Sequence, residues 1–376
     1  MKCVLFCHAF TSCWNNGNAH FLRGVARELD ALGHDVVIYE PADGWSRLNA
    51  LRDGGEQALR EADALLPGID IRQYQPGLNL EDALDDAGLV IVHEWNRPDL
   101  LKAIGRHRIL SGDYTLLFHD THHRAVTSPQ ELARFDLSGF DGVLAFGEIL
   151  REIYLELGWT NRAYTWHEAA DTGLYHPMPH IPRRNDVVWI GNWGDGERAA
   201  ELIEFLISPA SQLGLRGEIH GVRYSEAALR VIEAAGMDYC GWLPAHRAPA
   251  AFAAARATVH VPRGPYVQAL PGIPTIRMFE ALACGIPIVS APWSDVERLF
   301  PENAYLRARN GDQMRTALKT LLHDPQLACA TVKSGLDAIA ERHTCRHRVI
   351  QLLDIVAQIR GPRRQTAQSR REGALA

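Results

Sequence analysis

Short apolar runs of strand length alternate with amphipathic stretches along most of the chain. Within 18–32, apolar residues such as Phe21 and Val25 recur at helical spacing and a glycine follows, which predicts a helix and its end. The stretch 44–73 is rich in alanine, leucine and charge and is expected to be helical as well. Strands separated by helices indicate a parallel, doubly wound α/β sheet. The strands expected in this half are 2–6, 36–39, 89–93, 115–119 and 142–145.

A proline-rich stretch at 171–182 interrupts the alternation and is typical of an interdomain linker. Beyond it a second α/β series begins, with strands predicted at 186–190, 216–220, 237–240, 258–261 and 286–290. Helices are predicted at 197–207, 226–235, 275–284, 311–323, 325–343 and 345–360. The expected organisation is an N-terminal domain at 1–170, a linker at 171–182, a C-terminal domain at 183–344, a final helix at 345–360 and a disordered tail at 361–376.

Composition narrows the class of protein. The 376 residues are 47% hydrophobic and 22% charged, which is typical of a soluble globular protein large enough for two domains. A net charge of −6 argues against general affinity for nucleic acid. Seven cysteines without CxxC spacing indicate a reduced, cytoplasmic protein. The sequence shows no signal peptide, and no apolar run approaches the roughly 20 residues that a membrane-spanning helix needs. Only peripheral contact with a membrane is left open.

The segment GIPTIRMFEALACGIPIVS, at 272–290, carries the clearest chemical pattern. Its Pro-Thr pair suits the first turn of a helix, and Gly285 suits the left-handed residue past the end. Arg277 and Glu280 lie three apart and share a face. A helix N-terminus and a guanidinium stabilise a diphosphate, and a carboxylate can hold a ribose diol. We therefore predict a nucleotide-sugar site, the alternative being a solvated salt bridge on a helix surface.

This segment resembles the C-terminal signature of the group-1-like glycosyltransferases of GT-B architecture. The likeness is greatest to the CgeB-like branch, whose pattern is roughly P-T-R-x-F-E-A-L-A-C-G-x-P. It implies two Rossmann-like domains facing a cleft, with the helix at 345–360 crossing back onto the N-terminal domain. The broader group often carries two glutamates eight positions apart. Here Glu280 matches the second, the ribose ligand, whereas Gly272 stands where the first would contact the donor sugar.

A second phosphate-binding pattern follows the strand predicted at 186–190. Glycines after a parallel strand let backbone N–H groups approach a phosphate, and Arg198 can neutralise it. The CgeB-like pattern, G-N-W followed shortly by R, is similar, and the alternative is a tight turn with a surface arginine. Trp242 could stack on the base or belong to the core, and Tyr266 lies on a long loop. The expected donor-binding residues are Gly191, Asn192, Trp193, Arg198, Trp242, Tyr266, Thr275, Ile276, Arg277 and Glu280.

The loop after the first strand contributes candidates for the acceptor side of the cleft. Gly17 and Asn18 open the helix at 18–32, and Asn18 is expected to cap it. His20 resembles the histidine of a G-N-x-H pattern in family members. Alternatively, His20 has a structural role and is hydrogen-bonded within the surface between the two domains.

Polar residues at two further strand ends are the candidates for catalysis. His119 is the first choice, because many group-1 glycosyltransferases carry a histidine at this strand end near the reacting sugar. An imidazole titrates near neutrality and can accept or supply a proton. Asp120 and Glu94 are competing bases, and Glu94 could instead orient His119. A zinc site formed by His119, His122 and His123 is disfavoured by their spacing, so no metal is expected.

The resemblance implies a metal-independent glycosyltransferase that moves a sugar from a UDP-, GDP- or TDP-sugar to an acceptor and needs no further cofactor. A retaining outcome is expected. The acceptor could be a glycan, a protein or a small molecule, and the oligomeric state is not predicted. Two alternatives stay open: a nucleotide-sugar 2-epimerase of the same shape, and a non-catalytic nucleotide-sugar-binding or structural protein.

Overall fold

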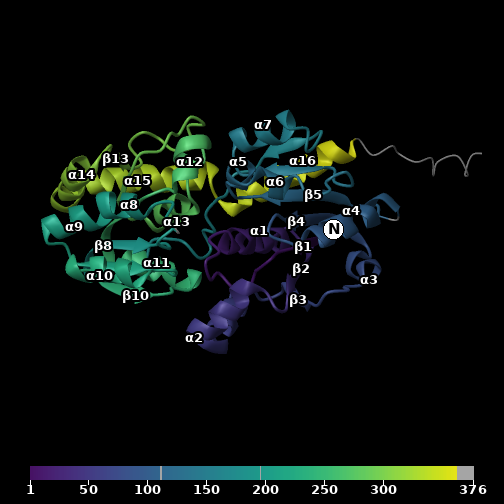
Figure 1. Ribbon diagram of the computed structural model, residues 1–376, viewed down its shortest axis with the longest axis horizontal. Coiled ribbons are helices and arrows are strands. Elements are labelled where there is room, and N and C mark those ends of the chain that lie inside the picture. Colours follow the sequence, from purple (N-terminus) through teal and green to yellow (C-terminus); the bar gives the residue numbers. More distant parts are fainter. Residues whose placement is uncertain (111, 195, 362–376) are drawn as a thin grey trace, which may run out of the picture.

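The computed structural model describes residues 1–110, 112–194 and 196–361, which form two parallel sheets side by side (Figure 1). The first sheet has seven strands in the order β3-β2-β1-β4-β5-β6-β7. These strands are β1 (Lys2–Phe6), β2 (Asp35–Pro41), β3 (Asp70–Tyr74), β4 (Ala87–His93), β5 (Thr115–Asp120), β6 (Gly142–Ala145) and β7 (Ala163–Thr165).

The second sheet has six strands in the order β10-β9-β8-β11-β12-β13. Its strands are β8 (Asn185–Ile190), β9 (Gly217–His220), β10 (Asp238–Gly241), β11 (Ala255–His260), β12 (Ile288–Ser290) and β13 (Leu306–Arg307). The strand order reverses between β1 and β4 in one sheet and between β8 and β11 in the other. Ligands of doubly wound sheets bind beyond the carboxyl ends of the strands at such reversals. The predicted α/β class with two parallel sheets is confirmed.

Helices cover both sheets. Those of the first half are α1 (Ala19–Ala31), α2 (Trp45–Asp63), α3 (Leu80–Leu84), α4 (Pro98–Leu110), α5 (Arg124–Thr127), α6 (Pro129–Leu132) and α7 (Glu148–Glu156). Those of the second half are α8 (Ala199–Leu202), the π-helix η1 (Ile203–Ile207), α9 (Ser208–Leu213), α10 (Glu226–Ala234), the 3-10 helix η2 (Ala245–Arg247), α11 (Ala248–Ala253), α12 (Gly264–Ala269), α13 (Ile276–Cys284), α14 (Gly311–His323), α15 (Pro325–Arg342) and α16 (Cys345–Arg360).

The last helix, α16, leaves the second half and packs on the first, where it lies beside α1 (Figure 1). The indole N–H of Trp166, which follows β7, donates to the backbone carbonyl of Arg348 on α16 at 2.8 Å. A Cβ at Gly24 on α1 would overlap the Cys345 sulfur, so glycine is what allows the two helices to approach. The chain thus returns to its first half, while the limits proposed for the domains remain predictions.

Several elements differ from the sequence-based expectation. The stretch 44–73 is helical only to Asp63, and β3 follows it. This strand, DIRQY, lies at the sheet edge, is mostly polar and has no buried residue, so it lacks the apolar alternation that identifies a half-buried strand. The helix expected at 197–207 is divided into α8 and η1, and α12 lies in a region expected to be a loop. Residues 362–376 of the expected tail lie outside the described residues.

Candidate functional site

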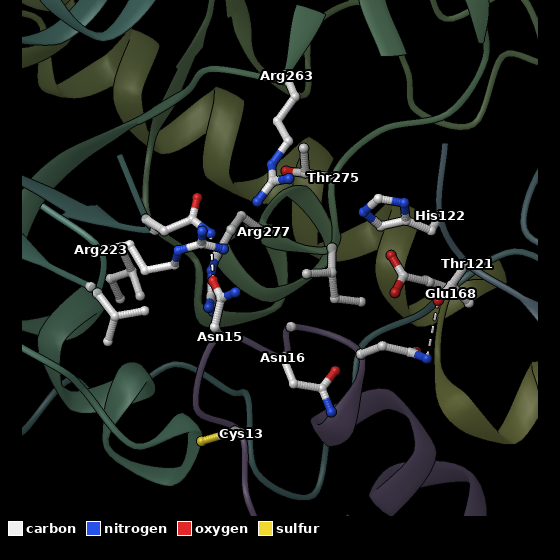
Figure 2. Close-up of a pocket in the computed structure, with 18 of the residues that line it drawn as sticks. Cys13, Asn15, Asn16, Thr121, His122, Glu168, Arg223, Arg263, Thr275 and Arg277 are labelled. Atoms are coloured by element: carbon white, nitrogen blue, oxygen red, sulfur yellow. Dashed lines mark hydrogen bonds between the residues drawn. The ribbon is translucent and has the colours of Figure 1, made fainter. Parts of the chain in front are cut away.

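A cavity of about 630 Å³ lies between the two halves, at the carboxyl edges of both sheets (Figure 2). The first half contributes the loop after β1 and the segments after β4 and β5. The second half contributes the segments after β8 and β11 and the N-terminus of α13. Both topological reversal points therefore open into one cavity.

The charge of the cavity wall is strongly positive. Four arginines line it: Arg198, Arg223, Arg263 and Arg277. Glu168 is the one carboxylate among the described residues of this wall. In Figure 2 the side chains of Arg263 and Arg277 reach toward the centre, and Glu168 and His122 lie on the side opposite Arg223. Arg263 pairs with Glu197 at 3.0 Å and Arg277 pairs with Glu280, and neither glutamate lines the cavity. Guanidinium groups clustered on one wall favour an anionic ligand, above all one with several phosphate oxygens.

Arg198 is buried without a carboxylate partner. Its guanidinium donates to the backbone oxygen of Asn192 at 2.8 Å and of Val261 at 3.3 Å. It also lies 5.1 Å from the ring centre of Trp189. Its Nε atom is buried and has no hydrogen-bond partner among the described residues. Burial, aided by the nearby Arg263, lowers the pKa of Arg198 to about 9, so the group stays charged near neutral pH and is costly to bury without an anion.

Helix α13 points its N-terminus at the cavity. Thr275 is the N-cap residue, but its side chain makes no capping hydrogen bond. Pro274, Thr275, Ile276 and Arg277 all line the cavity, so the first turn of α13 forms part of the wall. The unpaired N–H groups and the positive end of a helix dipole attract an anion there. The helix ends as predicted, with Gly285 in the left-handed conformation at φ 67°.

Glu280 lies one layer behind this wall and is fully buried. Its Oε2 accepts from the guanidinium of Arg277, and its Oε1 lies 2.7 Å from Nδ1 of His20, on α1. Burial alone would raise the pKa of Glu280, but the Arg277 charge, together with His20, outweighs it and the pKa is lowered. The carboxylate is therefore ionised and holds Arg277 against the cavity. Glu280 and His20 are not themselves lining residues, so Glu280 does not face the cavity directly.

The three residues expected to be catalytic lie behind the wall. His119, Asp120 and Glu94 are all buried, and none of them lines the cavity. The two ring nitrogens of His119 have no partners among the described residues, and burial lowers its pKa to about 3. Asp120 accepts from the hydroxyl of Tyr154 at 2.7 Å. Glu94 pairs with Arg124 at 2.8 Å and accepts from the backbone N–H of Thr121. These contacts hold the first sheet together at its cavity edge.

From this edge, Thr121 and His122 reach the cavity one and two positions beyond β5, and His93 and Trp95 reach it from the end of β4. Burial lowers the pKa of His122 to about 2, so its imidazole is neutral. Glu168, which follows β7, was not singled out by the sequence pattern as a site residue. Burial raises the pKa of Glu168 to about 8, and the nearby Glu280 charge acts in the same direction. Glu168 is therefore a protonated acid at neutral pH, and only its place between the two halves gives it that property.

Other expected residues divide between the wall and the interior. Asn18 reaches the cavity but does not cap α1, since its amide contacts His93 Nε2 at 2.7 Å and Thr121 Oγ1 at 3.3 Å instead. Trp193 packs against Tyr224, with ring centres 5.6 Å apart, and is not a lining residue. The expected residues that do line the cavity are Gly17, Asn18, Gly191, Asn192, Arg198, Trp242, Tyr266, Thr275, Ile276 and Arg277.

Potential metal ligands lie elsewhere. Among the described residues, one group of three ligand-type side chains has its atoms within 4.8 Å of one another, namely Glu218, His220 and Cys240. None of these three lines the cavity.

Comparisons with known proteins agree with this geometry. Residues 198–354 match the family model described as glycosyl transferase-like. Sucrose-phosphate synthase from Thermosynechococcus elongatus is similar at 14% identity, over 96% of this chain and 99% of that chain, with a TM-score of 0.64. Anabaena HepE in complex with UDP is similar at 14% identity, over 95% and 100%, with a TM-score of 0.66. T4 phage BGT in complex with UDP and Mn²⁺ is similar at 14% identity, over 96% and 99%, with a TM-score of 0.59.

A comparison with curated protein sequences finds no match. At these identities the structural likeness shows the fold, and the family match adds the class for residues 198–354. The solved structures confirm the expected GT-B architecture, and the glycosyl transferase-like family is matched by residues 198–354. The CgeB-like branch stays a prediction. Among the described residues, no helix is both long and apolar enough to cross a lipid bilayer.

Proposed function

We propose that the protein transfers a sugar from a nucleoside-diphosphate sugar to an acceptor hydroxyl in the cytoplasm. One observation carries this proposal: the four cavity arginines meet the N-terminus of α13 on a wall where Glu168 is the one described carboxylate. Structures of two proteins of this fold, HepE and BGT, contain UDP. A nucleoside diphosphate suits the wall because its phosphates can take several charge-assisted hydrogen bonds at once.

The diphosphate would bind Arg198, Arg263 and the backbone N–H groups at the start of α13. Arg277 would contact it as well, with Glu280 fixing the position of its guanidinium. A direct contact between Glu280 and the ribose requires Arg277 to release the carboxylate. The base would lie toward Trp242, at the end of the cavity formed by the second half. The acceptor would enter from the first half, past Thr121 and His122.

In the reaction, the bond between the anomeric carbon and the phosphate oxygen breaks, and the diphosphate leaves with the electron pair. The acceptor oxygen bonds to the anomeric carbon, and its proton passes to the departing phosphate. Negative charge grows on the diphosphate as the bond breaks, so prepositioned guanidinium groups and helix N–H groups stabilise the transition state more than the ground state. This supply of positive charge supports metal independence. The retaining outcome implied by the group-1 likeness is part of the proposal.

A thermal-shift panel with UDP, GDP, TDP and their sugars tests donor binding. A ligand at 100 times its dissociation constant adds about 2.7 kcal/mol, so one nucleoside diphosphate is expected to raise the melting temperature clearly. Arg198→Ala should remove the shift. Arg230→Ala is the matched control, since Arg230 lies exposed on α10 in an i,i+4 pair with Glu226. No shift with any of the nucleotides would overturn the proposal.

Incubation of the shifting nucleotide sugar without an acceptor then tests the reaction type. Slow hydrolysis or no change is expected from a transferase that lacks its second substrate. Conversion to an epimer would contradict transfer and favour an isomerase. The anomeric configuration of a transfer product, measured by proton NMR, tests the retaining outcome.

A further inference from the structure

A second cavity, of about 230 Å³, opens beside the first on the outer side of the N-terminal half. It lies beyond the carboxyl ends of β2, β3 and β4 and against α4. Its walls are largely apolar and include Tyr74, Leu78, Leu80 and Leu100. His8 and Trp95 line both cavities, so the two spaces meet at these side chains.

Two of the polar side chains that line the second cavity, Tyr74 and Asn96, are engaged within the protein. The hydroxyl of Tyr74 donates to Oδ1 of Asn96 at 3.4 Å. Nδ2 of Asn96 donates to the backbone oxygens of Phe6 and His93, both at 2.8 Å. Burial raises the pKa of Tyr74 to about 12, so its hydroxyl is neutral. Asp43, Gln75, Arg97 and Asp99 also line the cavity, and Arg97 pairs with Asp99 at 2.8 Å. Most of the remaining wall is apolar, which favours an apolar ligand over a bare sugar.

Trp95 stands at the junction with its side chain 44% exposed. The guanidinium of Arg124 lies 4.0 Å from the centre of its ring, and the His122 ring meets it edge-on with centres 5.0 Å apart. Arg124 is fixed in turn by its ion pair with Glu94. The indole is thus held in one orientation while much of it stays uncovered. An exposed aromatic ring held in this way can stack on a flat ligand at little entropic cost.

His8 supplies a polar atom at the same junction. Its Nδ1 is buried and has no hydrogen-bond partner among the described residues. Burial lowers the pKa of His8 to about 4, with Arg124 acting in the same direction, so the ring is neutral. A neutral imidazole can accept a hydrogen bond from a hydroxyl group. A buried polar atom without a partner is costly, and the His8 ring lies in the wall of both cavities, where a ligand can supply that bond after a small rotation of the ring.

Building on the proposed function, we infer that the second cavity holds the apolar ring system of a hydroxylated acceptor. The acceptor is a small molecule with fused aromatic or alicyclic rings, whose hydroxyl passes His8 and Trp95 into the arginine-lined cavity. The size fits: a dry cavity of about 150 Å³ accommodates benzene, and this one, at about 230 Å³, has room for a two-ring system.

Isothermal titration calorimetry tests the inference. It measures the binding of three hydroxylated ring compounds, 1-naphthol, 7-hydroxycoumarin and quercetin, and the binding of maltose as the sugar comparison. At least one ring compound is expected to bind, and maltose is expected to bind more weakly. Ala103→Trp places a bulky ring at the edge of the second cavity and should weaken ring binding by about tenfold or more. Leu110→Trp, on the same helix and outside the cavity, should leave it unchanged.

Trp95→Ala tests the inference independently, because it removes the aromatic ring instead of adding a bulky side chain. It should also weaken the binding of the ring compounds. Nucleotide thermal shifts are measured for every variant and should match the wild type for Ala103→Trp. Three outcomes overturn the inference. The wild-type protein responds to a nucleotide but binds none of the ring compounds, it binds maltose more tightly than the ring compounds, or Ala103→Trp binds the ring compounds as tightly as the wild type. Loss of the nucleotide response in the wild type would instead overturn the proposed function.

Discussion

Nδ1 of His20, on α1, lies 2.7 Å from Oε1 of Glu280, on α13. The two side chains come from opposite halves of the protein and are both buried beneath the arginine-lined cavity. The same histidine nitrogen contacts the backbone oxygen of Gly17 at 3.1 Å. Gly17 lies so close to α13 that an added Cβ would be 3.0 Å from Ile276. The loop after β1 and the N-terminus of α13 are therefore joined as one unit below the site.

Replacement of His20 by alanine should weaken this unit. The substitution removes one of the two buried partners of Glu280 and leaves Arg277 as the other, so the free energy of unfolding should fall by about 2 kcal/mol. Chemical denaturation measures this loss. His176→Ala, at an exposed histidine, is the matched control and should change stability little. An equal effect of the two substitutions would contradict a coupling between His20 and Glu280.

Substitution of Glu280 separates its charge from its volume. Glu280→Ala and Glu280→Gln should both reduce the nucleotide-induced thermal shift, because each removes the charge that holds Arg277. The pKa of Glu280 is lowered from 4.5, so its stabilising contribution is present above that pH and is lost as the pH falls below it. The stability difference between wild type and Glu280→Gln should therefore shrink on acidification. A difference independent of pH would argue against an ionised Glu280.

Glu168 predicts a pH effect of opposite sign. Burial raises its pKa from 4.5 to about 8, so the folded protein holds a proton that the unfolded chain releases between these values. Stability should fall as the pH rises from about 4.5 toward 8, and Glu168→Gln should flatten that dependence. If the protonated acid donates a hydrogen bond to substrate, activity of the wild type should also decline above about pH 8. An activity profile in Glu168→Gln that keeps the same alkaline decline would exclude Glu168 as its source.

Metal removal tests the role given to the arginines. Transfer activity should persist in EDTA, because Arg198, Arg263 and Arg277 supply the positive charge that the departing diphosphate needs. Addition of Mn²⁺ after chelation serves as the control. Activity that disappears in EDTA and returns with Mn²⁺ would contradict metal independence.

The pattern of apolar residues predicted most of the elements around the site. The strands at 2–6 and 142–145 and the helices at 311–323 and 345–360 have the predicted bounds. The turn at Gly285 also followed from spacing, whereas the pairing of Arg277 with Glu280 is the alternative that the spacing left open, in a buried form. These features depend on interactions between residues close in the sequence, which side-chain periodicity and glycine conformation reveal.

Sequence reasoning did not predict which way the side chains of the expected catalytic residues point. His119 was the first choice because many group-1 glycosyltransferases carry a histidine at this strand end, yet here it lies among Trp166 and Phe21, beneath α1. The cavity wall is formed instead by His122, a few residues later. A residue at the end of a strand can face a helix layer or the ligand, and the direction depends on how the strand meets its neighbours.

By itself, the sequence determined the two α/β series and the helix with its arginine and glutamate, and it indicated the glycosyltransferase-like family that residues 198–354 match. Only the tertiary structure decided that Glu280 reaches His20, that Glu168 is a buried acid in the wall, and that a second cavity joins the first at His8 and Trp95. Local periodicity records which face of an element is buried. The packing of two halves against each other sets distances and pKa values among residues up to hundreds of positions apart, and no local pattern encodes that arrangement.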